Sequence, residues 1–317
     1  MKRYDVVVVG GANTDFVVKG PKLPAPGETV DGRTFLQAAG GKGANQAVAC
    51  ARLGARVAFI GRVGRDQRGE ETIRTLRQEH VDVKHVTRDS TAPTGVALVM
   101  VDDSGEKQIM TAPGANHRLT VADVRRAAPL LRATKVLLMQ YEVPVSAVLT
   151  AAQIAGRAGA LVVIDPAPAR PTPRKLLRLI NVIRPNASEA EALMGRKITD
   201  VNTARRMAKK LFKAGLNAVA LQVGEADLIL WRDGEQKLPR LKVKTVDATG
   251  AGDAFAAGLA VALAEGRSYR EAGLFANAAA ALTTTRLGAQ PALPKRNEVL
   301  RLMHRTGHAK EARILGT

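Results

Sequence analysis

A glycine-rich turn carries the residues of this chain with the clearest chemical potential. It reads Asp-Ala-Thr-Gly-Ala-Gly-Asp over 247–253, and a small-residue segment predicted to be helical follows it. Such a turn points backbone N–H groups and the positive end of a helix dipole at one place, where an anion can bind. A carboxylate beside it, here Asp253, can take a proton from an attacking hydroxyl, so the pair suits phosphoryl transfer to an alcohol. A close-packed connection before a helix is the alternative interpretation of the turn alone.

A second glycine-rich segment lies far upstream and supports the first interpretation. It reads Gly-Gly-Lys-Gly-Ala-Asn-Gln-Ala over 40–47. The chain has no GxxxxGK[ST] motif, and Gly10-Gly11-Ala12 does not complete a GxGxxG fingerprint. The predicted anion site therefore belongs to neither of the two common phosphate-binding motifs.

The composition indicates a globular protein that builds its core from aliphatic side chains. The 317 residues allow two domains or one large α/β domain, and 46% are hydrophobic while only 3% are aromatic. No apolar run approaches the roughly 20 residues of a membrane span, and the short run at 6–9 favours a first strand over a signal peptide. The single cysteine, Cys50, cannot form an intrachain disulfide and is predicted to be buried. We expect a cytoplasmic protein.

The net charge of +19 is the least explained property of the sequence. It could attract nucleic acid or anionic substrates. The densest basic segment, 205–213, reads as an amphipathic helix with Met207, Ala208, Leu211 and Phe212 on one face, and few aromatic residues are available to stack on bases. We therefore favour a solvated helix face and expect no specific nucleic-acid partner.

Alternation of strands and helices runs through most of the chain. Strands are predicted at 4–9, 56–60, 135–140, 161–164, 181–183, 218–223 and 227–231. Helices are predicted at 42–53, 66–78, 121–131, 143–158, 188–194, 202–214, 251–264, 269–284 and 295–304. This rhythm implies a parallel sheet covered on both faces, with ligands at the carboxyl ends of its strands. Asn13, Asp15, Glu142 and Asn186 follow predicted strands and are expected there.

Three segments depart from the alternation. Residues 14–19, 28–36 and 96–111 suggest a small antiparallel layer that covers the site as a lid, and 102–105 carries a hairpin signal. The polar, basic residues 306–317 are expected to fray.

The ordered set of motifs resembles the ribokinase family of ATP-dependent sugar kinases, also called the PfkB family. The resemblance extends from about Tyr4 to Leu302 and rests on both glycine-rich segments and on 26–29, 139–142, 166–169, 185–189 and 288–291. It implies an α/β fold, a three-layer α/β/α sandwich with a mostly parallel central sheet and a small β-sheet lid. Residues 1–305 would form one kinase domain, with lid segments at about 14–36 and 95–112 and a basic tail at 306–317.

The resemblance also implies roles at the reacting end of the site. Asp253 would be the catalytic base, and the N–H groups of Ala251, Gly252 and Asp253 would hold the charge of the transferring phosphoryl group. The residues that match the family's sugar contacts are Asn13, Asp15, Gly41, Lys42, Asn45, Glu142 and Asp253. A helix N-cap for Asp253, turn chemistry for Asn13 and Asp15, and a surface position for Lys42 are the structural alternatives.

A further set of residues matches the family's nucleotide and metal sites. Those expected to bind ATP are Asn186, Gln222, Gly224, Gly252 and Asn277. Glu189 would help to hold Mg²⁺ through water, and K⁺ would activate the enzyme from a loop formed by Asp247, Thr249, Thr283, Arg286 and Gly288. The chain departs from the family at 224–227 and at Ala292, which affects the expected turn near the nucleotide and the expected cation site.

The implied activity is phosphorylation of D-ribose at O5 by ATP with Mg²⁺. A sister kinase for deoxyribose, fructose or a nucleoside is the nearest alternative, and a polyanion-binding protein on this scaffold is the alternative of another class. The resemblance further implies a homodimer formed through the lids.

Overall fold

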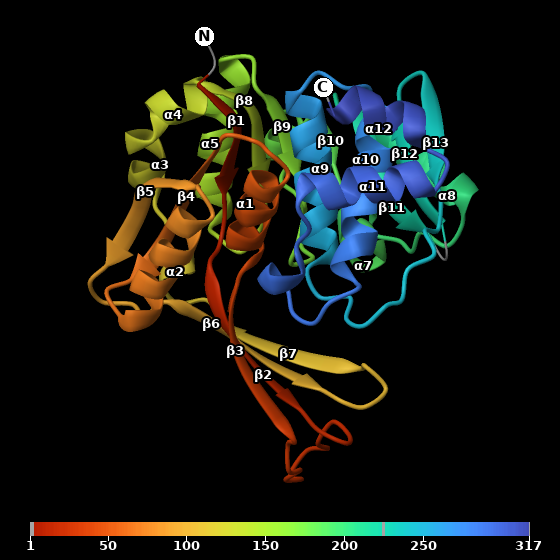
Figure 1. Cartoon of the computed structure of the whole chain (residues 1–317). Helices are drawn as coiled ribbons and strands as arrows, with labels where there is room; N and C mark the ends of the chain where they lie inside the picture. The colour runs from red at the N-terminus through yellow and green to blue at the C-terminus, as the bar shows by residue number, and fades with distance from the viewer. Residues whose placement is uncertain (1–2, 224–225, 317) are drawn as a thin grey trace.

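A computed structural model describes residues 3–223 and 226–316 of the chain, which form a helix-covered sheet and a smaller sheet beside it (Figure 1). The large sheet has the order β13-β12-β11-β10-β9-β8-β1-β4-β5. Neighbours from β11 to β5 are parallel, whereas β12 and β13 are antiparallel additions at one edge. Its strands are β1 (Tyr4–Val9), β4 (Val57–Gly64), β5 (Asp82–Asp89), β8 (Thr134–Met139), β9 (Leu161–Ile164), β10 (Val182–Ile183), β11 (Ala218–Val223), β12 (Ala226–Trp231) and β13 (Gly234–Leu238).

The large sheet has a hydrophobic core on each face, and successive side chains of a central strand belong to the two cores in turn. In β1, Val6 and Val8 belong to one cluster of buried residues, and Val7 and Val9 belong to the other. The first cluster is covered by α1 (Lys42–Arg52), α2 (Gln67–Gln78), α9 (Ala251–Ala264), α10 (Tyr269–Thr283), α11 (Arg296–Arg305) and α12 (Ala309–Gly316). The second is covered by α3 (Val121–Arg126), α4 (Ala128–Arg132), α5 (Val145–Arg157), α6 (Arg174–Leu177), α7 (Ala187–Met194) and α8 (Val201–Lys213). The predicted three-layer α/β/α sandwich is thus confirmed.

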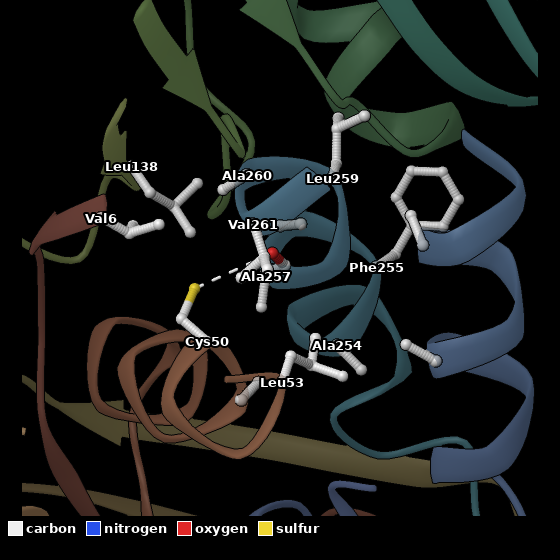
Figure 2. Close-up of a cluster of buried hydrophobic side chains, with 14 of the residues drawn as sticks. Val6, Cys50, Leu53, Leu138, Ala254, Phe255, Ala257, Leu259, Ala260 and Val261 are labelled. Carbon is white, nitrogen blue, oxygen red and sulfur yellow. Dashed lines mark hydrogen bonds between the residues drawn. The ribbon is translucent and has the colours of Figure 1, made fainter. Parts of the chain in front are cut away.

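Helices α1 and α9 pack side by side over the middle of the sheet (Figure 2). Cys50 lies at their contact, fully buried, with its Sγ 3.8 Å from the carbonyl oxygen of Ala257. Burial raises the pKa of this thiol, as predicted for a cysteine that acts as a small apolar residue. Alanines along α9 allow the close approach, so the two helices that begin at the glycine-rich segments are held together.

The small sheet extends away from the sandwich as a lid (Figure 1). It consists of β3 (Thr34–Gly40), β2 (Asn13–Lys19), β6 (Gly95–Val101) and β7 (Lys107–Ala112), in that order. The β6–β7 hairpin is present as predicted, but the expectation of an antiparallel layer is wrong at its centre, where β2 and β6 run parallel. Only residues 10–12 separate β1 from β2, so the central lid strand continues a central strand of the sandwich.

The remaining differences from the predicted elements have local causes. The helix expected over 121–131 is divided into α3 and α4, because Pro129 cannot donate the hydrogen bond that would continue the first helix. Residues 309–316 do not fray but form α12, whose Ala312 and Leu315 are buried against the first core. The basic segment in α8 is amphipathic as predicted, with Met207, Ala208 and Leu211 buried.

No helix in 3–223 or 226–316 combines the length and the apolar character needed to cross a membrane.

Candidate active site

The N-terminus of α9 forms an anion cradle at the carboxyl edge of the sheet. Gly250 precedes the helix with φ of 80°, a left-handed conformation that favours glycine, and no side chain caps this end. The first N–H groups of a helix have no acceptor within it. Those of Gly252 and Asp253 are therefore available to an anion, whereas that of Ala251 donates to the carbonyl of Ala248 at 3.3 Å.

Asp253 lies on the third residue of α9 and is only 5% exposed. Its Oδ2 accepts a hydrogen bond of 3.0 Å from Asn45 Nδ2, and its Oδ1 accepts one of 3.0 Å from Gln46 Nε2. The side chain does not cap the helix, so the N-cap alternative is wrong. Both amides come from α1 and fix the direction of the carboxylate, which keeps lone pairs for a substrate hydroxyl.

Lys42 connects Asp253 with a second buried carboxylate. Its Nζ lies 3.3 Å from Asp165 Oδ2 and 3.6 Å from Asp253 Oδ1. Gln46 Nε2 donates to Asp165 Oδ2 as well, at 2.9 Å. Asp165, Asp253 and Glu142 raise the pKa of the ammonium, against the effect of burial. Lys42 is therefore a charged member of this cluster and not a surface lysine.

The remaining residues of the predicted sugar set converge on the same place. Glu142, which follows β8, accepts a hydrogen bond of 2.8 Å from the backbone N of Lys42 through Oε2. Asn13, which begins β2, accepts one of 2.7 Å from Asn116 Nδ2 through Oδ1. Gly41 has φ of 85°, and a Cβ there would lie 2.6 Å from the Cα of Ala12, so the chain segments meet closely only because this residue is glycine.

Two carboxylates of this set have perturbed acidity. Burial and the charge of Asp253 raise the pKa of Asp15 to about 6. Burial raises the pKa of Glu142 to about 7, despite the nearby ammonium of Lys42. Carboxylates without enough neutralising partners are costly in a low-dielectric site. Hydroxyl groups of a ligand that donate to these carboxylates would offset that cost.

The predicted nucleotide residues that the structure describes are less closely grouped. Asn186 and Glu189 form a capping box at the start of α7, in which the backbone N of Asn186 donates to Glu189 Oε2 at 2.8 Å. Asn277 donates from Nδ2 to the carbonyl of Pro239 at 2.8 Å and supports the segment before the cradle. Gln222 is exposed near the end of β11. Gly224 lies outside the residues that the structure describes.

The predicted cation loop is closed by Asp247. Its Oδ1 accepts from the N and Oγ1 of Thr249, at 2.9 and 2.6 Å, and its Oδ2 accepts from the N of Gly288 at 2.9 Å. Arg286 directs its side chain to Glu298, and the Thr283 hydroxyl donates to the carbonyl of Ala279. The side chains of these last two residues are therefore engaged elsewhere, and only their backbone carbonyls are candidates for cation ligands.

Comparison with known proteins adds a decisive observation. A family model described as pfkB family carbohydrate kinase matches residues 3–296. The chain belongs to this family.

Individual members of the family are similar over nearly the whole chain. A ribokinase of Haemophilus influenzae is 40% identical over 302 residues, which cover 95% of this chain and 99% of the relative. A deoxyribokinase of Salmonella typhi is 34% identical over 254 residues, 79% of this chain and 83% of the relative. The solved structure of Arabidopsis thaliana ribokinase, complexed with ribose and ATP, is 33% identical with a TM-score of 0.84 and covers 94% of this chain and 98% of that chain.

Kinases of this family use ATP with a divalent metal such as Mg²⁺, and two carboxylates of this chain fit that ion. Asp165 is fully buried, and its Oδ1 has no hydrogen-bond partner among the described residues. Burial and the charge of Asp165 raise the pKa of Glu189. Oxygen donors of this kind are what Mg²⁺ takes, together with water and phosphate.

Sequence reasoning missed several polar residues of the site. Asp165 follows β9 and Arg184 follows β10, the same position that drew attention to Glu142 and Asn186. Gln46 lies inside a quoted motif without an assigned role. The rule that ligands gather at the carboxyl ends of parallel strands, applied to every strand, would have found the first two.

Proposed function

We propose that this protein transfers the γ-phosphoryl group of ATP to O5 of D-ribose, giving ADP and D-ribose 5-phosphate. The observation that carries the proposal is the placement of a buried, oriented carboxylate, Asp253, directly beside an uncapped helix N-terminus. Around it lie the polar groups of Asn13, Asp15, Lys42 and Glu142, whose donors and acceptors suit a polyol. The similarity to ribokinases over nearly the full chain supports the same substrate.

In the proposed reaction, the sugar lies between the lid and the sandwich with its 5-hydroxyl against Asp253. The carboxylate accepts the proton of this hydroxyl as the oxygen attacks the γ-phosphorus. The N–H groups of Gly252 and Asp253 bind the oxygens on which negative charge is spread, and that of Ala251 joins them if it exchanges the carbonyl of Ala248 for the phosphoryl group. Mg²⁺, when bound with ATP, neutralises charge on the phosphates, with Asp165 and Glu189 as the carboxylates available to it. Asn186, Gln222, Gly224 and Asn277 are proposed to border the nucleotide.

The test is turnover on a substrate panel. ADP release is measured with Mg-ATP and K⁺ on D-ribose, 2-deoxyribose, fructose and nucleosides. We expect D-ribose to be the best substrate, and Asp253→Asn to lower kcat by about 10²–10⁴-fold, since a positioned base contributes that much. The variant should still bind D-ribose in calorimetry.

Each outcome has a defined meaning. A clear preference for 2-deoxyribose would support the second candidate, a deoxyribokinase, which the Salmonella typhi relative favours. Full activity of Asp253→Asn would reject the assigned base.

We further propose that K⁺ occupies the loop closed by Asp247 and orders the anion cradle, with carbonyls of Thr283, Arg286 and Gly288 among its ligands. The support is the pair of backbone hydrogen bonds that join 246–247 to Thr284, beside the Asp247–Gly288 contact. Backbone carbonyls in a loop of this kind suit a large monovalent cation. The enzyme unit would comprise residues 1–305 together with α12, which packs against the first core, with lid segments at about 14–36 and 95–112, in the cytoplasm where ATP is made and used.

A homodimer formed through the lids is also part of the proposal. Paired residues share a face of a sheet, so one lid face carries Phe16, Val18, Phe35, Leu98, Met100 and Met110. Phe35 is 63% exposed and Met110 is 74% exposed, which is unusual for side chains of this size. Exposed apolar patches on a soluble protein mark surfaces that contact a partner.

A further inference from the structure

Arg184 is a charged residue that the reaction described above does not use, although it lies beside the anion cradle. It follows β10 directly, and its backbone N donates to the carbonyl of Ile164 at 2.9 Å, so its Cα is fixed by the sheet. Its side chain is 17% exposed. The guanidinium carbon lies 5.3 Å from the centre of the Phe255 ring, on the first turns of α9. Stacking of this kind holds the planar group in one orientation.

One guanidinium nitrogen of Arg184 lies close to Gly252. A Cβ added to Gly252 would lie 2.9 Å from NH1 of Arg184, so this nitrogen lies against the Cα of the middle residue of the cradle. The same NH1 lies 4.0 Å from Asp165 Oδ1, which is beyond hydrogen-bond distance. Arg184 therefore stands between the cradle and the buried carboxylate next to Lys42.

The distance between Arg184 and Asp165 is too long for a hydrogen bond, so this contact does not use the donors of the guanidinium or the acceptor Oδ1 of the carboxylate. Within 3–223 and 226–316, Asp165 Oδ1 has no hydrogen-bond partner, and the guanidinium interacts with Asp165, Asp227 and Glu189 only through longer-range charge attraction. A guanidinium has five N–H donors, and a mostly buried one without acceptors is costly. The unused guanidinium donors suit an anionic ligand with several oxygens, whereas the free Asp165 Oδ1 suits the cation that accompanies such a ligand.

We propose that Arg184 is a further catalytic residue, which binds oxygens of the transferring γ-phosphoryl group. The inference rests on the proposed kinase function and adds a residue to its site. During transfer, negative charge is spread over the equatorial oxygens of the phosphoryl group. The N–H groups of α9 approach them from one direction, and the guanidinium approaches from the side of the sheet. The fork of Arg184 matches two such oxygens, which a lysine ammonium cannot do.

Kinetics of Arg184→Ala and Arg184→Lys test the proposal, with Arg301→Ala on the surface of α11 as a control of equal charge change. We expect Arg184→Ala to lower kcat by about 10³-fold, the range for a lost arginine at a transferring phosphoryl group. The KM for the sugar should change less than about threefold, because the guanidinium is proposed to bind the phosphoryl group and not the sugar. Arg184→Lys should retain part of the activity, and guanidinium ion at millimolar concentration should partly restore Arg184→Ala. Arg301→Ala should behave as the wild type.

A binding measurement separates this inference from the proposed function. Calorimetry with Mg²⁺ compares ADP with a non-hydrolysable ATP analogue that carries a γ-phosphate. Arg184→Ala should weaken the analogue by about tenfold or more and ADP by less than about threefold, since a lost charged hydrogen bond costs that much. That result would support Arg184 even if no sugar on the panel were phosphorylated.

Two results would overturn the proposal. One is a kcat within threefold of the wild type. The other is an equal loss of affinity for ADP and for the analogue, with a lowered Tm and no rescue by guanidinium, which would assign Arg184 a structural role beside Asp165.

Discussion

Ionisation of a single residue, Asp15, lowers the free energy of unfolding of the protein. Its pKa of about 6 in the folded protein is above the ordinary value of 3.8, because it is buried and close to the charge of Asp253. The folded state therefore holds the proton more tightly than the unfolded state. The free energy of unfolding must fall as the pH rises from about 4 to about 6, and the full cost remains at higher pH.

Asp15→Asn removes this cost and should stabilise the protein without ligand. We expect a gain of about 1–3 kcal/mol at pH 8, from about 1.4 kcal/mol for each pKa unit, and a smaller gain at pH 4.5. Denaturant unfolding at both pH values measures it, with Asp31→Asn at an exposed position as the control. A loss of stability at pH 8 would contradict this account. Affinity for the sugar should fall in the same variant, because an acceptor is lost.

The sequence identified the two glycine-rich segments that the structure brings together. The turn at 247–253 and the segment at 40–47 are both recognisable alone, and the structure places Asn45 against Asp253. Prediction from sequence was less complete for Arg184 and Asp165. Their importance depends on which strand ends lie next to each other, and neither residue type is unusual after a strand.

Among the elements, the strands that escaped prediction are those at the edges of the large sheet. β5 reads Asp-Val-Lys-His-Val-Thr-Arg-Asp, and β13 reads Gly-Glu-Gln-Lys-Leu. Each has one neighbour and a solvated side, so charged residues are tolerated and the apolar pattern is weak. The parallel pairing of β2 with β6 was also unforeseen, because register between distant segments leaves no local signal. The central strands, buried on both faces, were recognised from their aliphatic runs.

The loop before α9 is the element on which the proposed cation should act. If K⁺ orders the segment that Asp247 closes, replacing K⁺ by tetramethylammonium at constant ionic strength should lower kcat at least about fivefold, because the cradle N–H groups would be less well positioned. Steady-state turnover at saturating Mg-ATP and sugar measures this effect. Potassium titrated back in should restore activity in a saturable manner. Equal turnover with both cations would reject the proposed site.

At the scale of the whole molecule, the lid surface predicts the state of association. Two lids that meet through the face containing Phe35 and Met110 would bury side chains that are now in water. Phe35→Glu with Met110→Glu should give half the mass of the wild type in light scattering, because charges would be buried at the contact. Ser104→Glu, in the β6–β7 turn, is the control and should remain dimeric. A wild-type monomer at micromolar concentration would contradict the proposed dimer.

The hydrogen bonds from Asn45 and Gln46 to Asp253 have a consequence for the synthesis of the protein. They join residues 208 and 207 positions apart, and the helices that carry them pack face to face in Figure 2. A ribosome completes most of the proposed sugar contacts early and reaches α9 late. A nascent chain that ends before residue 253 lacks the proposed base and the anion cradle, so we expect it neither to phosphorylate the sugar nor to hydrolyse ATP. We therefore expect ATP consumption to begin only after α9 has been synthesised.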